Sequence, residues 1–272
     1  MITNPLQILL SVIVVTVIGI TIYKLKIIDL LGVIASESVG LIIIILGGWE
    51  FLVILLTFLS ISGIFTKYKY SEKRKMGMAQ GKNGVRSWQN VLANSIVASF
   101  FVIAYGLIPS SKALMAGFLG AVSTSIADTL ATEIGLLSPY EPRLITNLSN
   151  RVKAGTSGGI TILGEVAGLF GVLFIVSVAR GVGFINPSIL SILVSIGAGF
   201  LGCTFDSFLG ATVQATFKCS VCGKDTEKNN HCQQQTLHVS GNKTMDNNMV
   251  NLISTIFGGS IAFFIHLIIT AN

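Results

Sequence analysis

The chain has 272 residues, of which 51% are hydrophobic and only 11% are charged, and its mean hydropathy is +0.78. A soluble domain usually carries about 25% charged residues, so this composition excludes an ordinary soluble protein and indicates an integral membrane protein. The net charge of +6 does not indicate nucleic-acid binding. The aromatic residues lie mainly in apolar runs, and no segment is long enough for a soluble nucleic-acid-binding domain.

Apolar runs long enough for a transmembrane helix, about 20 residues, recur along the whole chain. We therefore expect an all-α, polytopic bundle of about eight spans that forms a single transmembrane domain over residues 1–272. The break between the second and third spans depends on Gly47-Gly48-Trp49 alone, which supplies a tight turn and an interfacial aromatic ring. The expected spans are 4–23, 28–46, 49–65, 89–108, 113–136, 158–179, 185–214 and 249–270.

The basic residues predict the orientation of these spans. The loop 67–88 is strongly basic and contains one acid, Glu72, and the positive-inside rule places such a loop in the cytoplasm. Alternating eight spans from there puts every Lys and Arg except Lys112 and Arg180 on the cytoplasmic side. We expect a protein of the cell membrane whose long loops lie on that face, where a cationic surface also suits anionic lipid headgroups. Those loops are 67–88, 137–157 and 217–248.

Three polar residues stand at the start of the fourth expected span. Arg86, Asn90 and Asn94 are spaced i, i+4, i+8 and would lie near one helix face. Such a face can bind a phosphate or an anionic headgroup. The structural alternatives are interhelical hydrogen bonding by Asn94 and snorkelling of Arg86 to the interface.

The fifth expected span carries the sequence Asp128-Thr-Leu-Ala-Thr132-Glu133 near its inner end. A carboxylate at membrane depth is costly, so it is a functional candidate. Asp128 and Thr132 share a face and form a candidate ligand pair. Glu133 is turned about 140° from Asp128, so we expect it to point elsewhere or to lie at the interface, as a further polar group of the phosphate site.

A glycine-rich loop precedes the sixth expected span. Its residues Gly155, Thr156, Ser157, Gly158 and Gly159 follow a basic pair, Arg151 and Lys153. Glycines let backbone N–H groups approach an anion, and a helix N-terminus favours one, although a simple N-cap loop would have the same sequence. The loop is not a P-loop, because no Gly-Lys-Ser/Thr follows. Its place on the carboxylate side makes it a candidate phosphate site, with Lys153 as a catalytic cation.

The seventh expected span brings a second aspartate, Asp206, to the inner side, with Gln214 at its end. Two aspartates from different helices, with hydroxyl and amide oxygens, suit Mg²⁺, which takes few protein ligands and keeps water and substrate phosphates. We therefore expect Asp128 and Asp206 to hold Mg²⁺. The structural alternative for Asp206 is an ion pair with Arg or Lys.

A cysteine and histidine cluster lies within the loop 217–248. Cys219-Ser-Val-Cys222-Gly, with Cys232 ten residues later, resembles a small zinc knuckle, and His231 or His238 would complete a tetrahedron. A cytoplasmic location argues against a disulfide. The expected role of zinc here is structural.

The last expected span also opens with amides on the inner side. Asn247 and Asn251 are spaced i, i+4 and could join the same polar cluster. Capping of the helix by Asp246 or Asn247 is the simpler alternative.

Taken in chain order, these motifs resemble one family over most of residues 48–262. The carriers are Arg-Ser-Trp-Gln-Asn-Val-Leu-Ala-Asn (86–94), Ala-Asp-Thr-Leu-Ala-Thr-Glu-Ile-Gly (127–135), Gly-Thr-Ser-Gly-Gly-Ile-Thr (155–161), Gly-Cys-Thr-Phe-Asp-Ser-Phe-Leu-Gly-Ala-Thr-Val-Gln (202–214) and Asn-Asn-Met-Val-Asn (247–251). The chain resembles a prokaryotic member of the integral-membrane family that includes plant phytyl-phosphate kinase of vitamin E synthesis.

The resemblance implies transfer of a phosphoryl group from a nucleoside triphosphate, with CTP as one candidate, to an isoprenyl or phytyl monophosphate. The expected partners are this lipid, the nucleotide and the surrounding membrane lipids. Two other functions stay open: a CTP-dependent lipid cytidylyltransferase, which would share the metal site, and a lipid or ion transporter. Clustering of polar groups on one face favours the enzyme, because a transporter needs a polar path to both faces.

Overall fold

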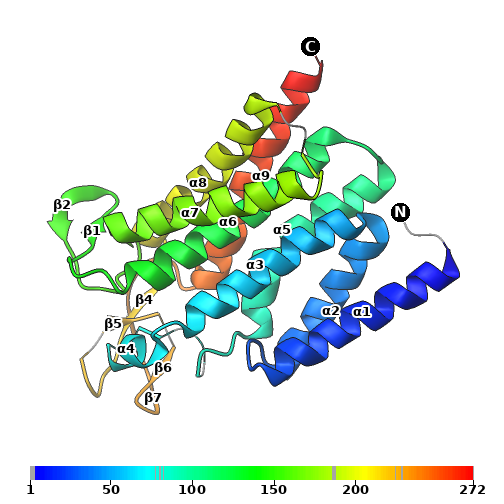
Figure 1. Ribbon diagram of the computed structural model, residues 1–272. Coiled ribbons are helices and arrows are strands. Elements are labelled where there is room, and N and C mark those ends of the chain that lie inside the picture. Colours follow the sequence, from blue (N-terminus) through cyan, green and yellow to red (C-terminus); the bar gives the residue numbers. More distant parts are fainter. Residues whose placement is uncertain are drawn as a thin grey trace.

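A computed structural model describes residues 4–76, 78–79, 81, 83–185, 188–223, 225–227 and 229–271. Within these residues the chain forms one bundle of long helices (Figure 1), which confirms the predicted all-α membrane fold. Lys82, Lys224 and Lys228 of the predicted basic face lie outside the described residues. The long helices are α1 Pro5–Lys24, α2 Leu30–Leu46, α3 Trp49–Lys67, α5 Trp88–Leu107, α6 Lys112–Gly135, α7 Ile162–Gly181, α8 Ile189–Thr212 and α9 Asn247–Ala271.

Seven of these helices are long and apolar enough to cross a membrane. The eighth, α2, has 17 residues, which is the lower limit for a span. The predicted turn between α2 and α3 is present. Gly48 there has a φ of +100°, a conformation that glycine adopts without steric cost.

The centre of the bundle is α6, which packs against α3, α5, α7, α8 and α9. Small residues (Gly, Ala and Ser) let these neighbouring helices approach closely, as is usual between membrane helices. A Cβ atom added at Gly120 would collide with the Gly258 backbone of α9, and one added at Gly202 of α8 would collide with Thr124 of α6. The central position of α6 is what allows Asp128 to meet residues from several other helices.

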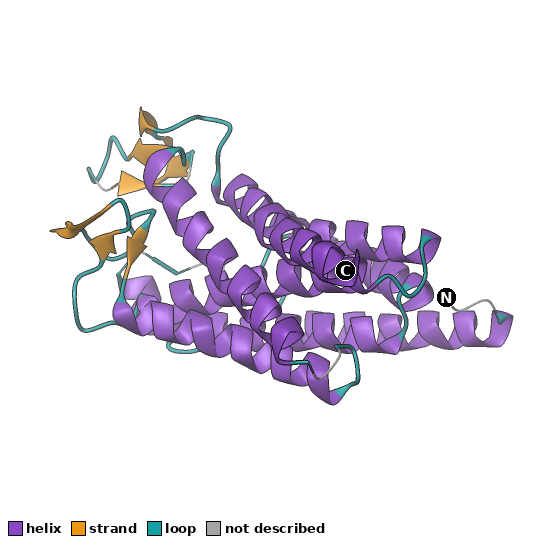
Figure 2. Cartoon of the chain, turned by 90° about the horizontal axis from the view of Figure 1, so that it is seen from above, coloured by secondary structure: helices purple, strands orange, loops and turns teal. Residues whose placement is uncertain are grey.

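The strands and the short helix α4 (Tyr70–Lys75) gather at one end of the bundle (Figures 1 and 2). A first antiparallel sheet has the order β2-β1-β3, and a second has the order β5-β4-β8, beside the hairpin β6-β7. The strands are β1 Arg143–Leu144, β2 Asn147–Arg151, β3 Gly159–Ile160, β4 Thr216–Lys218, β5 Asp225–Thr226, β6 Asn230–His231, β7 Gln234–Gln235 and β8 Leu237–Ser240.

Contacts between the connections confirm that they share this end. Ile28 and Arg86 form a parallel backbone bridge, and a Cβ at Gly155 would collide with Met78 of the basic loop. A second bridge joins Gln214 to Asn242. The long loops that the sequence assigns to one face therefore do lie together.

The predicted start of the sixth span, residue 158, is wrong. Gly158 has a φ of +72°, Gly159 pairs with Leu144 in the first sheet, and α7 begins only at Ile162. The Thr161 side chain caps α7 by accepting from the Gly164 N–H. The glycine-rich loop therefore leads into a strand, and the α7 N-terminus is already capped by the protein.

Candidate functional site

Asp128 of α6 and Asp206 of α8 meet at the end of the bundle that carries the strands. Their carboxyl groups are in hydrogen-bonding contact. Ser254 of α9 donates from Oγ to Asp206 Oδ2 at 2.7 Å. Asp206 therefore pairs with an aspartate and a serine, and no ion pair with an Arg or Lys of the described residues holds it.

Arg86 is buried close to this pair. Its Nη2 donates to Thr66 Oγ1 at 3.0 Å, while its Nε has no hydrogen-bond partner among the described residues. Burial lowers the pKa of the Arg86 guanidinium, and the nearby carboxylates of Glu133 and Asp128 act in the opposite direction. The side chain is thus a buried cation with one donor free for an anionic ligand.

The backbone around Arg86 differs from the predicted helix face. Arg86 N donates to Ile27 O and Arg86 O accepts from Asp29 N, both at 3.0 Å, so residue 86 is extended. Ser87 has extended dihedrals, and α5 begins at Trp88. The predicted i, i+4, i+8 ladder on one helix is therefore wrong for Arg86, although tertiary packing still brings its side chain near the two asparagines.

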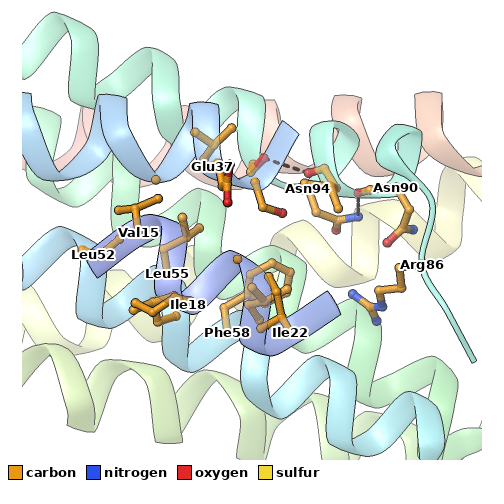
Figure 3. A pocket seen from close by; sticks show the side chains of 18 residues that line it. Val15, Ile18, Ile22, Glu37, Leu52, Leu55, Phe58, Arg86, Asn90 and Asn94 are labelled. Atoms are coloured by element: carbon orange, nitrogen blue, oxygen red, sulfur yellow. Dashed lines mark hydrogen bonds between the residues drawn. The ribbon is translucent and has the colours of Figure 1, made fainter. Parts of the chain in front are cut away.

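A pocket among α1, α2, α3 and α5 ends at these residues. The space inside it, counted out to its mouth and including open solvent there, is about 660 Å³. Figure 3 shows Arg86, Asn90 and Asn94 together at one end, and apolar side chains such as Val15 and Leu52 at the other. The remaining lining residues are Ile18, Gly19, Ile22, Ser36, Glu37, Val39, Gly40, Leu55, Leu56, Phe58, Leu59, Val91 and Ser95.

Four amide side chains, two of which line the pocket, have a polar atom with no hydrogen-bond partner in the part of the chain that the structure describes. The atoms are Asn90 Oδ1, Asn94 Oδ1, Gln214 Nε2 and Asn251 Oδ1. Most buried polar atoms in proteins are paired. Asn251 lies one helical turn before Ser254, which contacts Asp206. These unpaired donors and acceptors are available to a polar ligand.

Glu133 belongs to a separate contact. It is buried and accepts from Lys73 Nζ of α4 at 2.5 Å, so its side chain points into the protein. Lys73 also donates to the carbonyls of Phe65 and Thr66. This pair anchors the basic loop to the bundle next to Thr66, whose hydroxyl accepts from Arg86.

The glycine-rich loop lies against the inner end of α8. A Cβ at Gly158 would collide with Ala211, and one at Gly210 would collide with Gly158 N. Ser157 Oγ donates to Glu227 Oε1 at 2.8 Å. The loop therefore joins the aspartate-bearing helix to the insert between α8 and α9. Lys153, Gly155 and Thr156 are exposed on its outer side.

The other predicted polar residues lie at the margins of the site. Thr132 and Asn247 are half-buried. Asp246 accepts from Met249 N at 2.9 Å, so the capping alternative for the α9 N-terminus is confirmed for Asp246.

The four cysteine and histidine residues of the insert form one cluster. The ligand atoms of Cys219, Cys222, His231 and Cys232 all lie within 4.8 Å of one another. His238, the alternative histidine, instead contacts Gly241 O at 3.0 Å through Nε2. Of the two histidines offered by the sequence, His231 is therefore the one placed to bind a metal.

Three residues near the site were not found from the sequence: Lys73, Ser254 and Glu227. Lys73 is one of many basic residues in its loop, and Ser254 is one of many small polar residues on apolar helices. Glu227 is one of three exposed acids in the insert, with Asp225 and Asp246. Nothing in their spacing distinguishes them, because what places them is packing between distant segments.

The fold and the site define an integral membrane protein with a polar site at one end of its helix bundle and an apolar pocket whose polar end includes Arg86. The chain belongs to the family described as integral membrane protein DUF92, whose model matches residues 13–259. The family resemblance stated from the motifs is thereby confirmed.

Several relatives match over most of the chain. Protein PGR of Arabidopsis thaliana is 34% identical, with 93% of this chain and 94% of that protein covered. An uncharacterized membrane protein of Methanocaldococcus jannaschii, MJ0933, is 29% identical over 96% of this chain and 95% of its own length. Protein VTE6, chloroplastic, of Arabidopsis is 26% identical over 76% of this chain and 56% of its own length. No solved structure matches the chain significantly.

Proposed function

We propose that this protein is a membrane-embedded prenyl-phosphate kinase, which transfers a phosphoryl group from a nucleoside triphosphate to an isoprenyl or phytyl monophosphate. One observation carries the proposal. The apolar pocket ends at Arg86, Asn90 and Asn94, and Arg86 in turn lies near the Asp128–Asp206 pair. A substrate with a long apolar tail and a phosphate head matches the apolar walls of this pocket and its polar end.

Family membership supports the reaction type. The motifs of this chain resemble the family that includes plant phytyl-phosphate kinase, and VTE6 is a member matched over 76% of this chain. The 26% identity to VTE6 supports the class of reaction. The acceptor lipid and the donor nucleotide are our proposals.

The acceptor lies with its tail in the pocket and its phosphate at Arg86. The free Nε of Arg86 donates to a phosphate oxygen, and the amides of Asn90 and Asn94 bind the remaining polar atoms. A guanidinium is well suited to phosphate because its planar donors match the oxygens. Because Arg86 is buried, this contact forms away from water, where it is stronger.

The donor nucleotide binds at the glycine-rich loop, on the side of Lys153. Catalysis of phosphoryl transfer is mainly positioning and charge stabilisation, which is the role we assign to Lys153 and the backbone N–H groups of Gly155–Gly159. An oxygen of the acceptor phosphate attacks the terminal phosphorus of the donor, and the nucleoside diphosphate leaves. The basic residues at this end support a cytoplasmic location for the nucleotide site, because the positive-inside rule favours basic loops on that face and the nucleotide is available there.

The aspartate pair fits a Mg²⁺ site. Two carboxyl groups in contact repel each other when both are ionised, and a divalent cation removes that repulsion. Asp128 and Asp206 would hold the ion, with Asn251 Oδ1 as a further oxygen. When bound, Mg²⁺ would neutralise negative charge on the donor phosphates.

The experiment uses purified protein in detergent with geranylgeranyl or phytyl phosphate, Mg²⁺ and each nucleoside triphosphate in turn. We expect a prenyl diphosphate and the nucleoside diphosphate, with Asp128→Asn and Asp206→Asn each lowering the rate about 10²–10³-fold. The matched control is Asp246→Asn, because Asn also caps a helix and this exposed acid lies at the same end.

Product identity separates the alternatives. Release of pyrophosphate with a nucleotidyl-lipid product would establish the cytidylyltransferase instead. If folded wild-type protein makes no product with any combination of these substrates, the kinase proposal fails.

A further inference from the structure

The insert between α8 and α9 holds a cluster that the proposed reaction does not use. Cys219 follows β4, Cys222 lies in the next turn, and His231 and Cys232 lie at the β6-β7 hairpin. Cys219 is buried and His231 is half-buried. The insert is otherwise built from strands of two to four residues, which are too short to be stable alone.

Two distances in this cluster match those between neighbouring ligands of a tetrahedral metal site. Cys222 Sγ and Cys232 Sγ lie 3.5 Å and 3.3 Å from His231 Nδ1. In a zinc site with Zn–S of about 2.3 Å and Zn–N of about 2.0 Å, neighbouring S and N ligands are about 3.5 Å apart. The four side chains are therefore already spaced to surround one ion.

The backbone supports the same conclusion at both turns. Gly223 N donates to Cys219 O at 2.9 Å, and Gly223 has a φ of +68°, so the chain turns back directly after Cys222. At the hairpin, Cys232 and Gln233 have φ values of +51° and +61°. A two-residue turn with both φ positive normally takes Asn-Gly, so a cysteine in this conformation needs a compensating interaction. A bond from its sulfur to a metal supplies one.

The insert also contacts the candidate site. Glu227 lies between the two halves of the cluster in the chain, and its Oε1 accepts from Ser157 Oγ at 2.8 Å. Its charge acts on both Asp128 and Asp206. The insert therefore adds a hydrogen bond to the packing on α8 that holds the glycine-rich loop.

We propose that Cys219, Cys222, His231 and Cys232 bind one structural zinc ion, and that this ion fixes the insert so that Glu227 holds the glycine-rich loop at Ser157. A site with four protein ligands is closed, so the ion has a structural rather than a catalytic role. The zinc site itself does not depend on the proposed kinase activity.

The test begins with metal content. Protein purified without chelator contains about one zinc ion per chain, and Cys222→Ser and His231→Ala each lose it. Cys203→Ala, at a buried cysteine of α8 outside the cluster, keeps it. Replacement of zinc by Co²⁺ gives the visible absorption of a tetrahedral thiolate site. A wild type that lacks zinc and takes up no Co²⁺, or a Cys222→Ser variant that retains zinc, overturns the proposal.

The link to the loop is tested by limited trypsin digestion in detergent. Cys222→Ser exposes the chain after Lys218 and also after Lys153 in the glycine-rich loop. Glu227→Gln increases cleavage after Lys153 only, and it retains zinc. If Cys222→Ser loses zinc but leaves cleavage after Lys153 unchanged, the ion does not hold the loop, and that half of the proposal fails.

Discussion

Lys73 shows how much the environment of a single charged residue matters in this protein. Its side chain has no exposed surface, although it lies in the most basic segment of the sequence. It is held by Glu133 and by two backbone carbonyls at the end of α3. Removing one partner of such a pair leaves an uncompensated charge, which costs far more than the pair itself contributes.

We expect Glu133→Gln to lower the free energy of unfolding by about 3–5 kcal/mol. The double variant Lys73→Met, Glu133→Leu should recover most of this loss, because neither charge is then buried. The measurement is reversible unfolding in mixed micelles. The exposed pair Lys69–Glu72 gives the control, and Glu72→Gln should change stability by less than about 0.5 kcal/mol. Equal effects of Glu133→Gln and Glu72→Gln would contradict this account.

At the scale of elements, the pocket depends on how α1, α2 and α3 pack against α5. Each helix contributes apolar side chains to it, and Glu37 of α2 contributes a carboxyl group. Glu37 lies against Gly19 of α1, where a Cβ would collide with its carboxyl group. The two helices therefore meet at a polar contact within the pocket, which gives Glu37 a place that the sequence did not supply.

Filling this pocket should change which acceptor the protein prefers. Ile18 lines the pocket and Ile20, on the same helix, is exposed. We expect Ile18→Trp to lower kcat/KM for geranylgeranyl phosphate about 10–200-fold relative to geranyl phosphate, because the larger ring excludes the longer tail. Ile20→Trp should leave the ratio unchanged.

The same comparison of geranylgeranyl and geranyl phosphate can contradict the prediction that the prenyl tail occupies this pocket. If both tryptophan variants shift the ratio equally, or neither does, the tail does not lie in this pocket.

At the scale of the whole molecule, the connections predicted to share one face do gather at one end, together with the candidate site (Figure 1). We assign this end to the cytoplasm by the positive-inside rule. The exposed cysteines of the insert, Cys222 and Cys232, then face the cytoplasm as well.

This orientation predicts the pattern of labelling by a membrane-impermeant maleimide. In intact cells, Ser110→Cys in the short α5–α6 corner is labelled, whereas Ser149→Cys in β2 is labelled only after the membrane is opened. Both serines are exposed, so access depends on sidedness alone. Labelling of Ser149→Cys in intact cells would reverse the assigned topology.

The sequence by itself determined the class of fold, the approximate spans and the family. It also identified the side chains that are the main candidates for binding a metal. These follow from local properties: apolar length, the excess of basic residues in particular loops, and residue types that are costly in a membrane, such as Asp128 and Asp206. The Cys-x-x-Cys-Gly spacing is local in the same way.

Tertiary structure alone decided which of these residues meet. It joined Asp206 to Ser254, buried Lys73 against Glu133, and placed Arg86 in an extended segment beside the pocket. It also placed the end of the glycine-rich loop, Gly158 and Gly159, outside the predicted helix and packed the loop against α8. The physical reason is that these contacts join segments distant in the chain, and no periodicity or spacing within one segment records the packing that brings them together.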